Sequence, residues 1–198
     1  MCTRVLIEAM FDDYSERLFA HYVNGRWRAP FGCDSVTITT PMGTVAGQIV
    51  PAGARDIERA MRALSTVDHT QRQHLADILR ASIPHLAQAV AIQSATEPDK
   101  TQLELMVSAL CDATPSTAAV CVMGPDSARL VELGRALGAG LRQGVIWCPP
   151  PTLAIFATAI AQLVARANVP PGGFSLLHAN SATRHHAIRQ KGLTVIDI

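Results

Sequence analysis

The sequence has few charged residues and almost no net charge. Asp, Glu, Lys and Arg make up 17% of its 198 residues, and the formal net charge is +1. An average globular domain has about 25% charged residues. Such a chain has no basic surface for nucleic acid or for an anionic membrane, so neither is expected as a partner. A surface with so little charge instead favours contact with another protein chain.

Paired cysteine motifs and targeting segments are also missing. The five cysteines contain no C-x-x-C pair, and their odd number argues against a disulfide framework. The first 20 residues carry acidic side chains and lack the basic segment and apolar run of a secretory signal. The most apolar stretch, residues 153–165, is too short to span a bilayer and is interpreted as a buried helix. We therefore expect a cytoplasmic protein with reduced thiols.

The first half of the chain reads as an arm, a hairpin and several helices. Residues 1–20 are interpreted as an N-terminal arm and residues 21–198 as one domain. Strand-like runs at 36–39 and 45–50 flank a turn with Pro41 and Gly43, which predicts a β-hairpin. Apolar residues at helical spacing follow between 57 and 110. Pro84 should divide this helical region, and Thr101 with Glu104 predicts a capping box.

The second half alternates between strands and helices. Short apolar runs at 118–123, 144–147, 174–177 and 193–198 are separated by helical segments near 127–138, 152–167 and 181–190. This alternation predicts parallel strands joined by right-handed crossovers. Ser181 is expected to cap the last helix, and Gly192 to end it. The predicted fold class is α/β, with a helical first part, a β-hairpin and a small parallel sheet.

Five short segments resemble motifs of the aldehyde dehydrogenase superfamily. In chain order they are YVNGRW at 22–27, TPMGTVA at 40–46, DIERA at 56–60, EPDK at 97–100 and ANVPPG at 167–172. Their order and spacing are more specific than any one of them. The resemblance covers residues 21–198, with a weak stretch between 112 and 144.

This resemblance implies a partial aldehyde dehydrogenase fold. It comprises part of a Rossmann-like cofactor domain and a hairpin that helps to build an oligomer in the family. Val45 and Ile49 of the hairpin are therefore expected in an interface. The family's nucleophilic cysteine, general-base glutamate and second half of the cofactor sheet lie beyond the last residue of this sequence.

Two functional stretches of the family fall inside the sequence, and both are altered. The PWNFP loop supplies an asparagine to the oxyanion hole, but the corresponding segment, residues 124–128, reads GPDSA with Asp126 at that place. A carboxylate there would repel a developing oxyanion. The KPS segment supplies a lysine that binds the cofactor ribose, but residues 148–151 read CPPP. Cys148 cannot donate hydrogen bonds as an ammonium does. We expect no cofactor and no bound metal.

Two other patterns have ordinary explanations. Gly138, Gly140 and Gly144 superficially resemble a dinucleotide fingerprint, but the spacing is one residue too long and the pattern precedes a strand, so a helix-end loop is predicted. Cys148 could act as a nucleophile with His178, since both end predicted strands. The competing interpretation is a buried, unreactive thiol beside an unrelated histidine.

The sequence therefore predicts a catalytically inactive aldehyde dehydrogenase-like subunit or scaffold. Its partner would be a second copy or another enzyme subunit. One alternative is an NAD(P)-dependent aldehyde oxidoreductase component that a partner chain completes, in which case NAD or NADP would bind. Another is a repurposed small enzyme that uses the remaining cleft through Asp126, Cys148 or His178.

Overall fold

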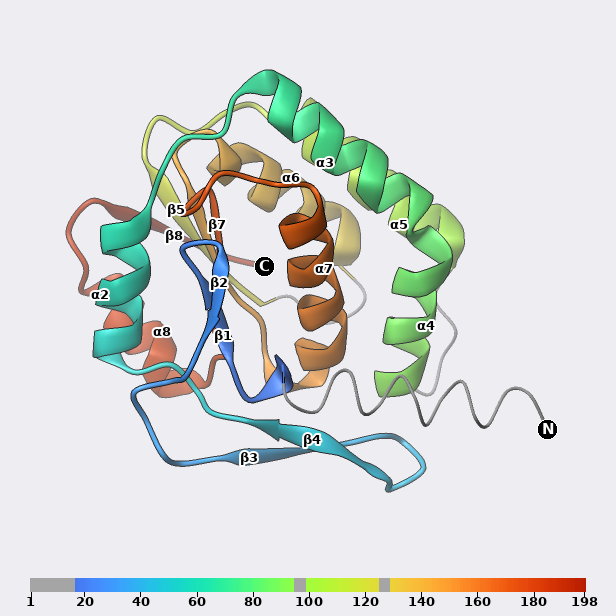
Figure 1. Ribbon diagram of the computed structural model, residues 1–198, viewed down its shortest axis with the longest axis vertical. Helices are drawn as coiled ribbons and strands as arrows, with labels where there is room; N and C mark the ends of the chain where they lie inside the picture. The colour runs from blue at the N-terminus through green and yellow to red at the C-terminus, as the bar shows by residue number, and fades with distance from the viewer. Residues whose placement is uncertain (1–16, 95–98, 125–128) are drawn as a thin grey trace.

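The computed structural model describes residues 17–94, 99–124 and 129–198. Most of the expected N-terminal arm lies outside these residues, as does Asp126. The described part is an α/β fold with a central sheet, helices on both faces and a separate hairpin (Figure 1). This architecture confirms the predicted fold class.

The central sheet has six strands in the order β2-β1-β7-β6-β5-β8. Its parallel part consists of β5 (Ala119–Met123), β6 (Val145–Cys148), β7 (Phe174–Leu176) and β8 (Leu193–Asp197). The strand β1 (His21–Val23) pairs antiparallel with β7, and β2 (Arg26–Arg28) pairs with β1. Asn24 and Gly25 join β1 to β2 with φ values of 55° and 71°, which suit a tight two-residue turn.

Helices cover the two faces unequally. One face packs against α3 (His69–Ala81), α4 (Ile83–Gln93), α5 (Lys100–Asp112), α6 (Leu130–Leu141) and α7 (Ala154–Arg166) in the larger hydrophobic core. The other face packs against α2 (Ala54–Ala63) and α8 (Ser181–Ile188) in a smaller core. Figure 1 shows α2 and α8 together on one side of the sheet and α3 to α7 on the other.

The most apolar segment of the sequence forms the buried helix α7, as predicted. Its residues 154–164 are all buried, and the short helix η2 (Pro151–Leu153) leads into it. No helix of the described residues is long and apolar enough to cross a membrane.

Two helix starts differ from the prediction. The cap of α5 is Asp99, whose Oδ1 accepts a hydrogen bond from the Thr101 backbone N–H at 2.9 Å, so the predicted capping box is wrong. Asn180 caps α8, and Ser181 is the first helical residue. In both cases an amide or carboxylate side chain one or two residues earlier accepts a hydrogen bond from a free N–H group of the first turn. Pro84 lies in the first turn of α4 and divides it from α3, as expected.

The glycines near residue 140 serve helix packing, and the predicted helix-end loop is wrong for two of them. Gly138 and Gly140 lie inside α6. A Cβ on Gly134 would come within 2.1 Å of the Met106 carbonyl oxygen, and one on Gly138 within 2.2 Å of the Leu110 carbonyl oxygen. Glycine therefore allows the backbones of α5 and α6 to touch.

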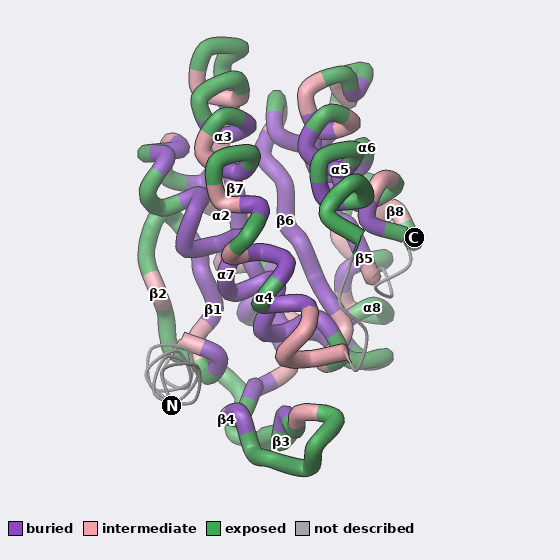
Figure 2. The backbone as a smooth tube through the Cα atoms, turned by 90° about the vertical axis from the view of Figure 1, so that its right-hand side faces the viewer, coloured by how far each residue is buried: buried purple, intermediate pink, exposed green. Residues whose placement is uncertain are grey.

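The predicted hairpin is present, formed by β3 (Val36–Thr39) and β4 (Val45–Ile49). It forms its own two-stranded sheet at one end of the molecule, and Figure 2 shows its turn largely exposed. Ile38 and Ile49 on its inner face are buried, whereas Met42 is 93% exposed and Val45 62% exposed. The hairpin thus anchors through one face and leaves apolar side chains free on the other.

Candidate functional site

An open groove lies where the parallel strands end. It encloses about 420 Å³ and lies at the carboxyl ends of β5, β6 and β8 and the start of α8. Ligand sites of open α/β sheets are found at this edge. The groove is lined by Met123, Gly124, Cys148, Pro150, Pro151, Ala179, Asn180, Ser181, Arg184, Asp197 and Ile198.

The charged groups of the groove neutralise each other. Arg184 Nε donates to Asp197 Oδ1 at 3.0 Å, and a second contact joins Arg184 Nη2 to Asp197 Oδ2. This pairing lowers the pKa of Asp197 and raises the pKa of Arg184, in each case mainly through the hydrogen bond between them. Asn180 is also engaged, because its Oδ1 accepts from the Thr183 backbone N–H at 3.0 Å. Few polar groups remain to hold an anionic ligand.

Cys148 lies at the inner wall of this groove with a protonated thiol. Its side chain is 1% exposed, and its Sγ lies 3.7 Å from Cys121 Sγ. The hydrogen bond with Cys121 and burial both raise the pKa of Cys148 well above its usual range. A cysteine nucleophile needs a negatively charged thiolate, and a cofactor-binding cation needs a positive charge. The Cys148 thiol carries neither charge at neutral pH.

His178 is placed away from the groove. It is fully buried, and its ring centroid lies 5.9 Å from that of His21. Burial, followed by repulsion from His21, lowers its pKa to about 3, while the backbone of Leu18 acts weakly in the opposite direction. Neither ring nitrogen makes a well-directed hydrogen bond within the described part of the chain. The structure thus places Cys148 on the groove and His178 beside His21, and Asp126 lies outside the described residues.

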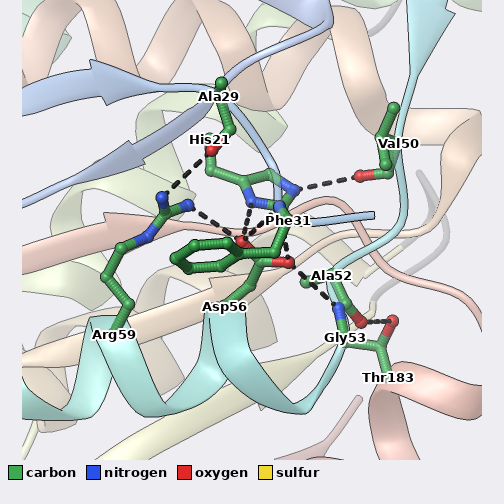
Figure 3. A network of polar contacts seen from close by, with 9 residues as sticks. All are labelled: His21, Ala29, Phe31, Val50, Ala52, Gly53, Asp56, Arg59 and Thr183. Atoms are coloured by element: carbon green, nitrogen blue, oxygen red, sulfur yellow. Dashed lines mark hydrogen bonds and ion pairs between the residues drawn. The ribbon is translucent and has the colours of Figure 1, made fainter. Parts of the chain in front are cut away.

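A polar network that the sequence did not predict joins β1 to α2 (Figure 3). His21 Nδ1 lies 3.4 Å from Asp56 Oδ1, and His21 Nε2 lies 3.0 Å from the Val50 carbonyl oxygen. Arg59 donates through Nη2 to Asp56 Oδ1 at 2.9 Å, and through Nη1 to the Ala29 carbonyl at 3.0 Å. The DIERA motif contains Asp56 and Arg59, but nothing in the sequence pointed to His21 as their partner.

Asp56 is the centre of this network and stays ionised. Burial raises the pKa of Asp56, but His21 and the backbone N–H groups of Gly53 and Phe31 together outweigh that effect and lower it. Gly53 N lies 3.2 Å from Oδ2, and Phe31 N lies 3.2 Å from Oδ1. Because the carboxylate is buried and its partners come from three separate segments, it ties these segments of the fold together.

Comparison by structure finds similar proteins that comparison by whole sequence does not. No protein-family model and no curated protein matches the sequence. The Delta-pyrroline-5-carboxylate dehydrogenase of Mycobacterium tuberculosis superposes with a TM-score of 0.76 at 16% identity, over 98% of this chain and 45% of that one. HpcC of Thermus thermophilus superposes with a TM-score of 0.74 at 18% identity, over 96% of this chain and 45% of that one. Aldehyde dehydrogenase C of Pseudomonas syringae gives a TM-score of 0.74 at 18% identity, over 91% and 45%.

These superpositions show the fold alone. The chain has the fold of part of an aldehyde dehydrogenase, as its motifs implied, and it spans about 45% of the length of these solved chains. The structures of the M. tuberculosis and P. syringae enzymes contain NAD or NAD+.

Proposed function

We propose that this chain is a non-catalytic subunit with an aldehyde dehydrogenase-like fold that assembles with a second copy of itself. The observation that carries the proposal is the state of Cys148. It stands at the end of β6, where the family resemblance expects a lysine for the cofactor ribose, and its thiol is buried against Cys121 at 3.7 Å. An uncharged thiol supplies neither the ammonium of a cofactor site nor the thiolate of a nucleophile.

The rest of the groove supports the same interpretation. A nicotinamide dinucleotide carries a pyrophosphate, which needs cations or free backbone N–H groups. Here Arg184 is paired with Asp197, and Asn180 occupies an N–H group at the start of α8. The residues present therefore do not fit NAD or NADP well.

The hairpin supports the assembly part of the proposal. An isolated two-stranded hairpin is only marginally stable in water. Exposed apolar side chains on such a hairpin favour contact with a partner that removes them from water. Met42 and Val45 provide such side chains on the outer part of the hairpin. The family resemblance also gives this hairpin a role in oligomers. The sparse charge of the sequence favours a protein partner as well.

Calorimetric titration of the purified chain with NAD and NADP tests the groove. We expect no binding tighter than roughly millimolar, which corresponds to about 4 kcal/mol. An aldehyde panel followed at the absorbance of reduced nicotinamide should give no turnover above a blank without protein. Micromolar binding, or turnover that Cys148→Ala abolishes, would contradict the non-catalytic assignment.

A second titration distinguishes a non-catalytic subunit from an enzyme whose active site a partner chain completes. The chain is mixed with a clarified lysate fraction of its own host, re-isolated, and titrated again with NAD. We expect the heat of binding to stay at the level of the blank. Cofactor binding that arises only with a co-purifying chain would overturn the proposal in favour of a shared active site.

A further inference from the structure

Three sulfur atoms gather at the inner end of the groove. Cys121 Sγ lies 3.7 Å from Cys148 Sγ and 3.8 Å from Met123 Sδ. Cys121 and Cys148 are at most 1% exposed, and Met123 is 7% exposed. All three belong to the smaller hydrophobic core, between the sheet and the helices α2 and α8.

The strand register explains why these side chains meet. Cys121 and Met123 are two residues apart on β5, so both point to the same face of the sheet. Met123 is the direct partner of Cys148 on the neighbouring parallel strand β6, so the Cys148 side chain points to that face too. The strand backbones therefore place all three sulfur atoms on one face of the sheet without help from a loop.

The two sulfur–sulfur distances from Cys121 suit one small ion. With metal–sulfur bonds of about 2.3 Å, three sulfur atoms around a trigonal ion lie about 4 Å from one another. The two distances that involve Cys121 are slightly shorter, so the ligands need to move apart by only a few tenths of an ångström. Side-chain rotation can supply that movement.

The ligand type selects among metals. Two thiols and a thioether are soft ligands, which favour Cu(I). Structural zinc takes four ligands, and iron–sulfur clusters take four cysteines. Among the described residues no group of three His, Cys, Asp or Glu side chains could hold a metal ion, so neither zinc nor an iron–sulfur cluster fits this site. A single positive charge also suits this apolar setting, because Cu(I) that replaces one thiol proton leaves the site neutral.

We propose that Cys121, Cys148 and Met123 form a binding site for a monovalent soft metal ion, Cu(I). The ion enters from the groove, which Cys148 and Met123 line. On binding, a sulfur–metal bond replaces a thiol S–H bond and the proton passes to solvent, with no change of oxidation state. Proton release makes the affinity fall as the pH is lowered. This site is independent of the proposed assembly role, because the hairpin contributes nothing to it.

Anaerobic titration of the full chain with Cu(I), with bicinchoninate as competing chelator, tests the proposal. The background variant carries Cys2→Ala, Cys33→Ala and Cys111→Ala, so that only the two strand cysteines remain. We expect one ion per chain to be taken from the chelator. X-ray absorption of the wild-type complex should show about three sulfur neighbours near 2.3 Å.

Two further variants assign the ligands. Cys148→Ala should abolish the competition with bicinchoninate, and Met123→Leu should weaken it by roughly tenfold or more. Circular dichroism and thermal melting check that both variants fold. The X-ray absorption spectrum is recorded on the wild-type complex, so it tests the ligands even if a variant does not fold. The proposal is overturned if the background variant takes up no copper, if Cys33→Ala alone removes the binding, or if the spectrum shows nitrogen or oxygen neighbours.

Discussion

His21 Nδ1 lies 3.4 Å from Asp56 Oδ1, and both side chains are fully buried. The other nitrogen of His21 lies 3.0 Å from the Val50 carbonyl oxygen, so Nε2 carries the hydrogen of that bond. Through this pair the short strand β1 is tied both to α2 and to the segment that follows the hairpin. His21 therefore links β1 both to the carboxylate of Asp56 on α2 and to the base of the hairpin.

Asp56→Asn should destabilise the protein strongly. The change keeps the shape of the side chain but leaves His21 and Arg59 without their anion, and breaking a buried charge pair costs about 3 kcal/mol. The free energy of unfolding in urea measures the effect. Because the pKa of Asp56 is lowered in the folded state, its contribution is present above the ordinary value of 3.8 and is lost as the pH falls through the folded value.

Glu58→Gln on the same helix provides the matched control. Glu58 pairs with Arg62 at 3.3 Å on the surface, where their side chains are 48% and 78% exposed. An exposed pair of this kind contributes about 0.5 kcal/mol or less. Equal losses for the two variants would show that the buried network has no special weight.

His178 should make the fold sensitive to mild acid. Its folded pKa is about 3, below the ordinary value of 6.5, so the unfolded chain binds an extra proton between these values. Stability from this group therefore falls as the pH drops below about 6.5, by about 2 kcal/mol between pH 7 and pH 5. His178→Gln should remove that part of the pH dependence.

Urea unfolding at pH 7 and pH 5, compared between wild type and variant, measures this difference. His74→Gln is the control, because His74 is exposed on α3. A wild-type loss that persists unchanged in His178→Gln would assign the acid sensitivity to other groups, such as the carboxylates.

Gly134→Ala should separate α5 from α6. The new methyl group would lie 2.1 Å from the Met106 carbonyl oxygen, and a backbone atom cannot rotate away. Overpacking of this kind costs about 2 to 3 kcal/mol. Gly53→Ala is the control, since a Cβ there meets nothing within 4 Å and its φ of −92° is ordinary. Thermal unfolding of both variants makes the comparison, and a fully stable Gly134→Ala would show that the helices shift freely.

The sequence predicted those features that depend on local patterns. Period-two and period-3.6 spacing gave the hairpin, the helices and the parallel strands, and Pro84 gave a helix boundary. Gly138 was misread as part of a helix-end loop, because it packs against a helix some 28 residues earlier in the chain, where a Cβ on it would lie 2.2 Å from the Leu110 carbonyl oxygen. Only the folded structure shows such contacts.

The candidate site was predictable in position but not in detail. The end of β6 places Cys148 at the strand edge, as its motif suggested, but pairing with Cys121 depends on the register of two strands. The network of His21 and Asp56 joins residues 35 positions apart and leaves no periodic signal. Ile49, expected in an interface, is 0% exposed within the chain itself. An alternating strand pattern does not tell which face meets the rest of the same chain.

The outer part of the hairpin is the surface through which we propose that two copies assemble. Met42 and Val45 are 93% and 62% exposed there, so replacing both with glutamate changes the surface and leaves the buried Ile38 and Ile49 in place. Leu105→Glu on α5 is the control, because Leu105 is also apolar and is 47% exposed.

Sedimentation velocity of the purified chain at micromolar concentration is the most direct test. We expect an oligomer for the wild type and for Leu105→Glu, and a monomer with unchanged helical content for the Met42→Glu, Val45→Glu variant. A wild type that sediments as a monomer, or a double variant that still assembles, would contradict this proposal.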